Sequence, residues 1–131
     1  MSREADVVRA VLVTHGALGG ELVRTAEAIL GPQDGVAIVS NEGVSLDGLV
    51  ETLRTAAGAP GPVVFLVDLL GGSCGHACRA LRAERGADAF VVTGVNLPML
   101  LEFFYHRDRV PYAELQERLI HKGRDGVRSL P

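Results

Sequence analysis

Short runs of β-branched and other apolar residues alternate along this chain with longer amphipathic segments. The expected strands are Val7 to Thr14, Val36 to Ser40, Val63 to Asp68 and Ala89 to Thr93. Strands that alternate with helices predict stacked βα units and a mostly parallel sheet. The third run is apolar up to its last residue without polar alternation, which is typical of a strand buried on both faces.

The segments between the strands carry the signals that start and stop helices. Serine at a helix start can accept a backbone N–H, and glycine followed by proline ends a helix. We expect a first helix that opens within Gly16 to Gly20 and stops at Gly31, and a second from a Ser45 cap to Gly58. A third should run from a Ser73 cap to about Arg85. The last two should span about Pro98 to His106 and Tyr112 to Lys122. The tail from Gly123 to Pro131 is compatible with a last helical turn and with an extended arm.

These elements predict an α/β fold with three layers. We expect a mostly parallel four-stranded sheet in the order 2-1-3-4, flanked by helices, because the first and third strands of such chains are usually neighbours. A chain of 131 residues, 47% of them hydrophobic, can bury one core without disulfides or metals. We therefore expect residues 1–131 to form a single domain.

Charge and cysteine content exclude several classes of protein. The net charge is −3 and the basic residues form no dense stripe, which argues against nucleic-acid binding. Two cysteines are too few for a secreted disulfide scaffold. The longest apolar run, Val63 to Leu70, is too short to span a membrane, and Met1 to Asp6 lacks the apolar core of a signal peptide. We expect a cytoplasmic protein that does not insert into a membrane.

A histidine and an aspartate follow two strands that we expect to be neighbours. His15 comes directly after the first strand and Asp68 ends the third. In open parallel sheets, ligands bind outside the carboxyl ends of the strands, where the strand order reverses. A carboxylate that accepts the proton of one imidazole nitrogen leaves the other nitrogen free as a nucleophile. The pair therefore predicts nucleophilic chemistry at His15.

A glycine-rich turn follows Asp68 and leads into the third expected helix. Gly71, Gly72 and Ser73 would present backbone N–H groups, and Ser73 would add a hydroxyl donor. Helix N-termini bind phosphate well, and phosphoryl transfer needs mainly positioning and charge stabilisation. A phosphohistidine relay therefore suits this arrangement better than hydrolysis does.

Several separated motifs, in this order, make the chain resemble the mannose-type IIA component of the bacterial phosphoenolpyruvate-dependent sugar phosphotransferase system (PTS). The resemblance covers nearly the whole chain. Its motifs are Val13-Thr14-His15-Gly16, Leu22 with Thr25-Ala26-Glu27 and Leu30-Gly31, Phe65-Leu66-Val67-Asp68, Gly71-Gly72-Ser73, Gly94-Val95-Asn96-Leu97-Pro98-Met99-Leu100, and Gly123-Arg124-Asp125-Gly126-Val127.

The resemblance implies roles for several residues in these motifs. It implies that His15 accepts a phosphoryl group from the phosphocarrier protein HPr and passes it to a IIB component for sugar uptake. Asp68 would orient His15, Ser73 would help to hold the phosphoryl group, and Thr14 and Asn96 are second-tier candidates near the pocket. The resemblance also implies a homodimer with an exchanged C-terminal strand. We expect no cofactor and no metal.

The chain departs from this family after the glycine-rich turn. Family members usually have proline and asparagine where this chain has Cys74 and His76, so the phosphate cradle is expected to be altered. Cys74, His76 and Cys78 could suggest a metal site. However, His76 points away from the helix face that the two cysteines share, and no fourth ligand lies nearby. We interpret the cysteines as small core residues and His76 as exposed.

Of four other functions, some fit the residues as well as the IIA relay does, and others fit less well. A regulatory phosphocarrier domain would use the same histidine. The phosphotransfer subunit of dihydroxyacetone kinase shares the fold and uses a histidine in the same way, although Gly94 to Leu100 favours the mannose type. A receiver domain phosphorylated on Asp68 would need an acidic pair at the end of its first strand to bind magnesium, and this chain has Val13-Thr14-His15 there. A dinucleotide-binding domain would need G-x-G-x-x-G, which Gly16-Ala17-Leu18-Gly19 lacks.

Overall fold

Four parallel strands form the sheet that the sequence predicts. The protein is represented by a computed structural model that describes residues 7–131, so the N-terminal segment Met1 to Asp6 lies outside the described residues. The strands are β1 (Arg9–Thr14), β2 (Val36–Ser40), β3 (Val63–Val67) and β4 (Ala89–Thr93). They pair in the order β2-β1-β3-β4, and every pair is parallel. The predicted order is confirmed.

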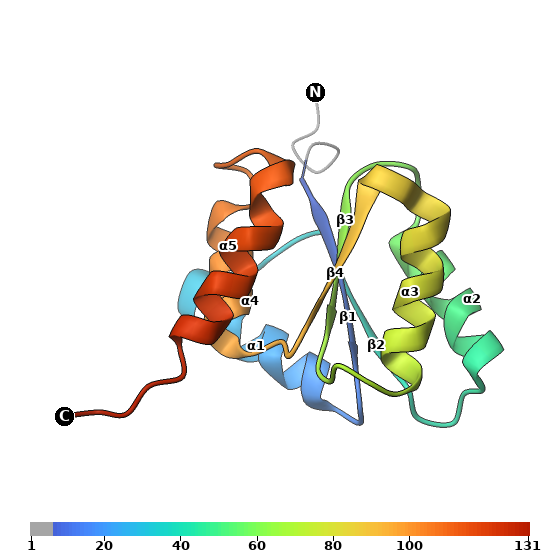
Figure 1. The fold of residues 1–131 in the computed structure, drawn as a ribbon, viewed down its shortest axis with the longest axis horizontal. Helices are drawn as coiled ribbons and strands as arrows, with labels where there is room; N and C mark the ends of the chain where they lie inside the picture. Colours follow the sequence, from blue (N-terminus) through green and yellow to red (C-terminus); the bar gives the residue numbers. More distant parts are fainter. Residues whose placement is uncertain (1–6) are drawn as a thin grey trace.

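Helices cover both faces of this sheet and complete three layers, as Figure 1 shows. One layer holds α1 (Leu18–Leu30), α4 (Leu97–His106) and α5 (Tyr112–Asp125), and the other holds α2 (Leu46–Ala57) and α3 (Ser73–Arg85). A short 3₁₀ turn, η2 (Gly86–Asp88), leads from α3 into β4. The α/β class with flanking helices is therefore confirmed.

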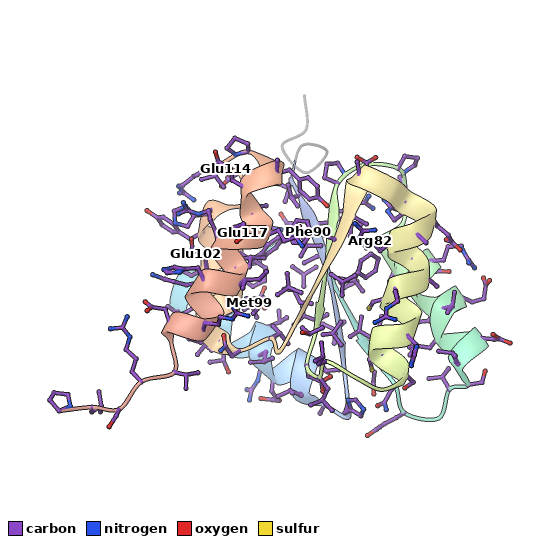
Figure 2. All side chains as sticks on the ribbon, viewed as in Figure 1. Arg82, Phe90, Met99, Glu102, Glu114 and Glu117 are labelled. Atoms are coloured by element: carbon purple, nitrogen blue, oxygen red, sulfur yellow. The ribbon has the colours of Figure 1, made fainter. Side chains whose placement is uncertain are left out.

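The core consists of two hydrophobic clusters, one on each face of the sheet. Alternate residues of β3 enter opposite clusters: Leu66 packs toward α1, α4 and α5, whereas Phe65 packs toward α2 and α3. All of β3 is buried, as its unbroken apolar run predicts. Figure 2 shows Phe90 and Met99 between the sheet and the α4–α5 layer, while Glu117 lies on the outer surface of α5.

Several element boundaries differ from the prediction, and β3 ends at Val67 rather than at Asp68. The first strand begins at Arg9, not Val7, because Arg9 pairs with Val63, the first residue of β3, and the ladder has no partner before it. The last helix continues past Lys122 to Asp125. Gly123 lies inside this helix, and a Cβ there would come within 2.7 Å of the Met99 Cε atom, so a larger residue would displace the end of the flexible Met99 side chain.

The C-terminal tail resolves into a helical part and an extended part. Residues up to Asp125 are helical, and residues 126–131 are exposed and irregular. Figure 1 shows this tail pointing away from the rest of the chain. Among the described residues 7–131, every helix is too short or too polar to cross a membrane.

Helix α1 packs unusually close to the end of β1. The Gly19 N–H donates a hydrogen bond of 2.7 Å to the buried Thr14 Oγ1 atom. A Cβ at Gly19 would lie 2.9 Å from that oxygen and 3.2 Å from the Ile38 Cγ2 atom, whereas a Cβ at Gly20 would meet nothing within 4 Å. The short distance from Thr14 to Gly19 fixes the loop that carries His15.

Two neighbouring glycines therefore form a matched test of this packing. We expect Gly19→Ala to lower the free energy of unfolding by about 1–3 kcal/mol, because the added methyl group overpacks the contact with Thr14. We expect Gly20→Ala to raise it by about 0.5–1 kcal/mol, because alanine loses less entropy in a helix than glycine does. Urea denaturation measures both values. Equal effects of the two substitutions would contradict the close packing described here.

Candidate functional site

His15 and Asp68 meet at the carboxyl ends of two adjacent strands. His15 follows the last residue of β1 and Asp68 follows the last residue of β3, and the register pairs Val13 with Val67. Asp68 Oδ2 accepts a hydrogen bond of 2.9 Å from the His15 backbone N–H. The His15 Nδ1 atom lies 3.0 Å from Asp68 Oδ2 and 3.2 Å from Oδ1. The carboxylate thus holds both the backbone and the ring of His15.

This contact selects one tautomer of the neutral imidazole. An ionised carboxylate can only accept hydrogen bonds, so the Nδ1 atom that faces Asp68 carries the proton. The lone pair then lies on Nε2, which is the nucleophilic nitrogen. The His15 side chain is 42% exposed, while the Asp68 side chain is only 9% exposed. The arrangement therefore combines a shielded orienting group with a nucleophile that another molecule can reach.

The hydrogen bonds to Asp68 also change its acidity. Burial of the carboxylate raises its pKa, because the charged form loses hydration. The backbone N–H and the ring of His15 act in the opposite direction, and together they hold the pKa of Asp68 below its usual value. Asp68 therefore stays ionised and keeps accepting the hydrogen bond from Nδ1–H throughout the neutral range.

The glycine-rich turn after Asp68 forms the start of α3. Gly71, Gly72 and Ser73 are all exposed. The prediction that Ser73 caps this helix is wrong: Gly72 is the N-cap, with φ of 92°, and Ser73 is already the first helical residue. Glycine tolerates this backbone conformation far better than serine does. The first helical hydrogen bond runs from the His76 N–H to the Gly72 carbonyl, so the earlier N–H groups have no acceptor within the helix.

The two second-tier candidates, Thr14 and Asn96, lie at helix starts. Thr14 is fully buried and holds the first turn of α1 through Gly19. Asn96 is the N-cap of α4: its Oδ1 atom accepts from the Met99 N–H at 3.0 Å, and its Nδ2 atom donates to the Gly123 carbonyl at 3.0 Å. Thr14 adjoins His15 along the chain, whereas the hydrogen bonds of Asn96 join α4 to α5.

Sequence reasoning missed the position of Cys74 relative to His15. The two cysteines are buried core residues and His76 is exposed, as predicted. In addition, the Cys74 Sγ atom, a His15 ring nitrogen and an Asp68 oxygen all lie within 4.8 Å of one another. Burial and the negative charge of Asp68 raise the pKa of the Cys74 thiol. The available signal was that Cys74 lies in the first turn of the helix that follows Asp68.

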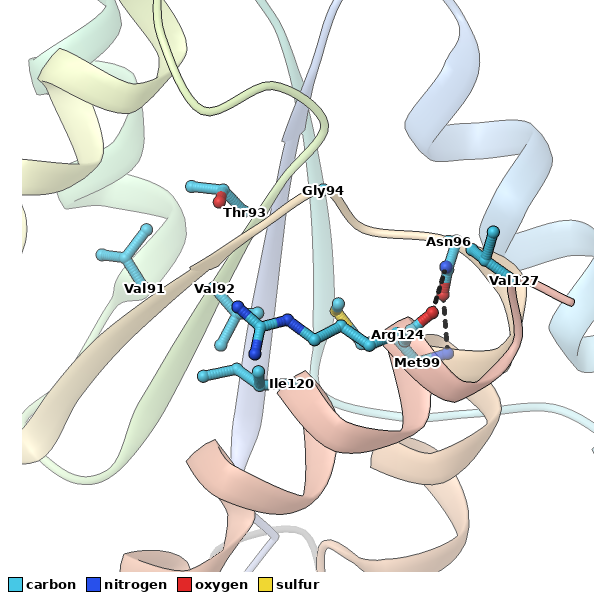
Figure 3. A pocket seen from close by; sticks show the side chains of 10 residues that line it. Val91, Val92, Thr93, Gly94, Asn96, Met99, Ile120, Arg124 and Val127 are labelled. Atoms are coloured by element: carbon cyan, nitrogen blue, oxygen red, sulfur yellow. Dashed lines mark hydrogen bonds between the residues drawn. The ribbon is translucent and has the colours of Figure 1, made fainter.

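A separate groove runs along the outer edge of β4. It has a volume of about 420 Å³, and the residues that line it come from β4, the start of α4 and the end of α5. Figure 3 shows the Arg124 side chain lying along this groove toward β4, and the hydrogen bonds of Asn96 at one end. None of the residues that line the groove is His15, Asp68 or Ser73.

Comparison with known families and sequences gives a consistent set of similarities. The family model EIIA-man, described as PTS system fructose IIA component, matches residues 9–120. The chain is 35% identical over 129 residues to the PTS system mannose-specific EIIAB component of Escherichia coli (strain K12). This match covers 92% of the chain but only 38% of the relative. The chain therefore spans well under half the length of the relative that it matches.

Solved structures agree with this similarity. The phosphotransferase system component EIIA from Streptococcus agalactiae superposes with a TM-score of 0.86 and 25% identity, covering 93% of this chain and 96% of that one. The mannose/sorbose specific IIA subunit from Enterococcus faecalis gives a TM-score of 0.85 and 25% identity, covering 95% of this chain and 96% of that one.

The lowered pKa of Asp68 predicts a pH-dependent contribution to stability. A carboxyl whose pKa is lower in the folded state stabilises that state above its unfolded pKa, about 3.9, and loses this effect as the pH falls through the folded pKa. We expect Asp68→Asn to be less stable than the unsubstituted protein at pH 7. The difference should shrink as the pH falls below about 4. Urea denaturation across this pH range measures it.

Glu117→Gln is the matched control, because Glu117 is exposed on the outer surface of α5. It also removes one carboxylate, but no strand end depends on it, so we expect a small difference in stability that does not follow the same pH curve. If the stability difference between Asp68→Asn and the unsubstituted protein did not change with pH, this would contradict the linkage between the ionisation of Asp68 and folding.

Proposed function

The chain belongs to the EIIA-man family of PTS system fructose IIA components, and from this premise we propose that it is a phosphohistidine relay. His15 takes a phosphoryl group from the phosphocarrier protein HPr and passes it to a IIB component for sugar uptake. PTS IIA components are transferases of this system. The observation that carries the proposal is the contact between His15 Nδ1 and Asp68, which leaves the Nε2 lone pair free on a side chain that is 42% exposed.

The transfer itself needs few groups. The Nε2 lone pair attacks phosphorus, the new N–P bond forms, and the bond between phosphorus and the donor breaks. The Nδ1 proton stays between the ring and Asp68, whose negative charge balances the positive charge that develops on the ring. The unpaired N–H groups at the start of α3, near Ser73, are suited to receive phosphoryl oxygens. Phosphoryl transfer depends mainly on such positioning and charge stabilisation.

The surface beside His15 supports a protein as the donor and acceptor. Leu69 and Leu70, which follow Asp68 in the chain, are 55% and 82% exposed, and Leu18, at the start of α1, is 44% exposed. Exposed apolar side chains that gather beside a polar site are typical of surfaces that contact another protein. The relative from Escherichia coli is named an EIIAB component, which supports a IIB component as the acceptor.

The groove along β4 and the C-terminal tail support a homodimer. Within residues 7–131, β4 is one of the two edge strands and pairs with β3 alone. In the tail, Val127 is 79% exposed and Leu130 is 89% exposed. An exposed edge strand readily accepts another strand. We therefore propose that the tail of one protomer pairs with the β4 edge of its partner, as an exchanged strand.

Labelling with phosphoenolpyruvate, enzyme I and HPr tests the relay. We expect one acid-labile phosphoryl group on His15 in the unsubstituted protein and none in His15→Ala. We expect Asp68→Asn to slow the transfer by roughly 10²- to 10⁴-fold, the range seen when a catalytic histidine loses the group that fixes its tautomer. Quenched-flow measurement of labelled protein gives the rates.

His76→Ala is the matched control for His15→Ala, because His76 is another exposed histidine, located in α3. It should label like the unsubstituted protein. Circular dichroism should show that all variants remain folded. Acid-labile label that persists in His15→Ala would overturn the assignment, and an unchanged rate in Asp68→Asn would remove Asp68 from the transfer.

The oligomeric state tests the role of the tail. We expect light scattering after gel filtration to give the mass of two chains for the unsubstituted protein, and of one chain for the double variant Val127→Asp, Leu130→Asp, because buried carboxylates oppose the pairing. Ile29→Asp, which changes an apolar residue that is 58% exposed on α1, is the control and should remain a dimer. A dimer that survives the double substitution would contradict the exchanged tail.

A further inference from the structure

Three chemically different ligand groups converge at the end of the sheet. The His15 imidazole comes from the loop after β1, the Asp68 carboxylate from the loop after β3, and the Cys74 thiol from the first turn of α3. One donor atom from each lies within 4.8 Å of the other two. Within residues 7–131, no other set of three His, Cys, Asp or Glu side chains is grouped in this way. The relay described above gives the sulfur no task.

We propose that His15, Asp68 and Cys74 form a binding site for Zn²⁺. One imidazole nitrogen, one carboxylate oxygen and the Cys74 sulfur supply three ligands, and a fourth position stays open to water. The Cys74 thiol proton is released to solvent as the Zn–S bond forms, and the imidazole proton moves from Nδ1 to Nε2 so that the Nδ1 lone pair can bind the ion. The ion binds the two side chains, His15 and Asp68, that are joined by a hydrogen bond when the ion is absent.

The spacing of the three groups suits a tetrahedral ion. Zinc binds sulfur at about 2.3 Å and nitrogen or oxygen at about 2.0–2.2 Å, so two ligand atoms of one tetrahedral ion lie about 3.3–3.6 Å apart. The His15 Nδ1 and Asp68 Oδ1 atoms are already 3.2 Å apart. The remaining pairs lie within 4.8 Å and need only a small approach. The partly exposed His15 ring can make this approach by rotation.

The donor set selects the metal. Magnesium and calcium prefer sites built from oxygen alone, so a thiolate disfavours them. Sulfur with imidazole nitrogen and one carboxylate oxygen is a combination that zinc accepts in sites with three protein ligands. The Cys74 side chain is fully buried, whereas the His15 side chain is 42% exposed. The ion can therefore enter from the His15 side and meet the sulfur at the base of the site.

Zinc at this place would oppose the proposed relay. A metal bound to the imidazole withdraws electron density from the ring, and it occupies the carboxylate that orients the ring. We therefore expect bound Zn²⁺ to inhibit phosphorylation of His15. This consequence rests on the proposed function, whereas the zinc site itself rests on the three side chains alone.

The chain offers a matched pair of cysteines for the test. Cys74 and Cys78 are both buried in α3, one helical turn apart, but only Cys74 belongs to the cluster. We expect the unsubstituted protein and Cys78→Ala to bind one Zn²⁺ in competition with a chromophoric chelator. We expect Cys74→Ala and His15→Ala to bind it at least about 10- to 100-fold more weakly, the loss typical even of residues that only support a ligand. Equal affinity of Cys74→Ala and Cys78→Ala would overturn the proposal.

A second measurement needs no variant and covers the case in which Cys74→Ala fails to fold. Co²⁺ added to the unsubstituted protein should give the intense near-ultraviolet band of a thiolate bound to cobalt, together with the visible bands of a four-coordinate ion. Zn²⁺ should displace the cobalt and remove both. A cobalt spectrum without the thiolate band would overturn the proposal, whatever the variants show.

The effect on phosphorylation is measured separately, so that the two proposals fail in different ways. With enzyme I and HPr already phosphorylated and freed of excess metal, Zn²⁺ should slow the labelling of the unsubstituted protein and of Cys78→Ala. Cys74→Ala should label at its own metal-free rate at the same Zn²⁺ concentration. Zinc binding without any labelling would refute the relay and leave the site intact, whereas labelling without thiolate-dependent zinc binding would refute the site alone.

Discussion

The parallel pairing of β1 with β3 is the constraint on which the rest of this structure depends. It brings together two residues that are 53 positions apart in the chain, because each directly follows its strand. The carboxylate of Asp68 then holds the backbone N–H and the ring of His15 at the same time. A slip of one residue in the register would turn Asp68 to the opposite face of the sheet and break both contacts.

Burial changes steeply across the site, and this change matches the role that we propose for each group. Thr14 is fully buried and ties the end of β1 to α1 through Gly19, so the loop that carries His15 has little freedom. Asp68 is mostly shielded, which strengthens its interaction with the ring, while the ring itself remains within reach of another molecule. Two exposed leucines after Asp68 extend the contact surface beyond the polar centre.

The first turn of α3 brings a second kind of chemistry to the same place. Its free N–H groups favour an anion such as a phosphoryl group, whereas the Cys74 sulfur, next to Asp68 and His15, favours a soft cation. The anion and the cation would require the same imidazole, so they exclude each other. A site that transfers phosphoryl groups and binds zinc in this way would respond to the metal through simple competition, without a change in fold.

The sequence alone determined most strands and helices, because hydrophobic periodicity and the stops at Gly31 and Gly58 are local signals. It also predicted the order of the sheet, because the first and third strands of such chains are usually neighbours. It likewise predicted that His15 and Asp68 lie close together, since residues that follow parallel strands share one edge. Tertiary packing decided the rest. The start of β1 at Arg9 depends on where β3 begins, and the N-cap at Gly72 depends on the path of the preceding loop. The approach of Cys74 to His15 depends on how α3 docks on the sheet, and no local pattern encodes a contact made across three separate elements.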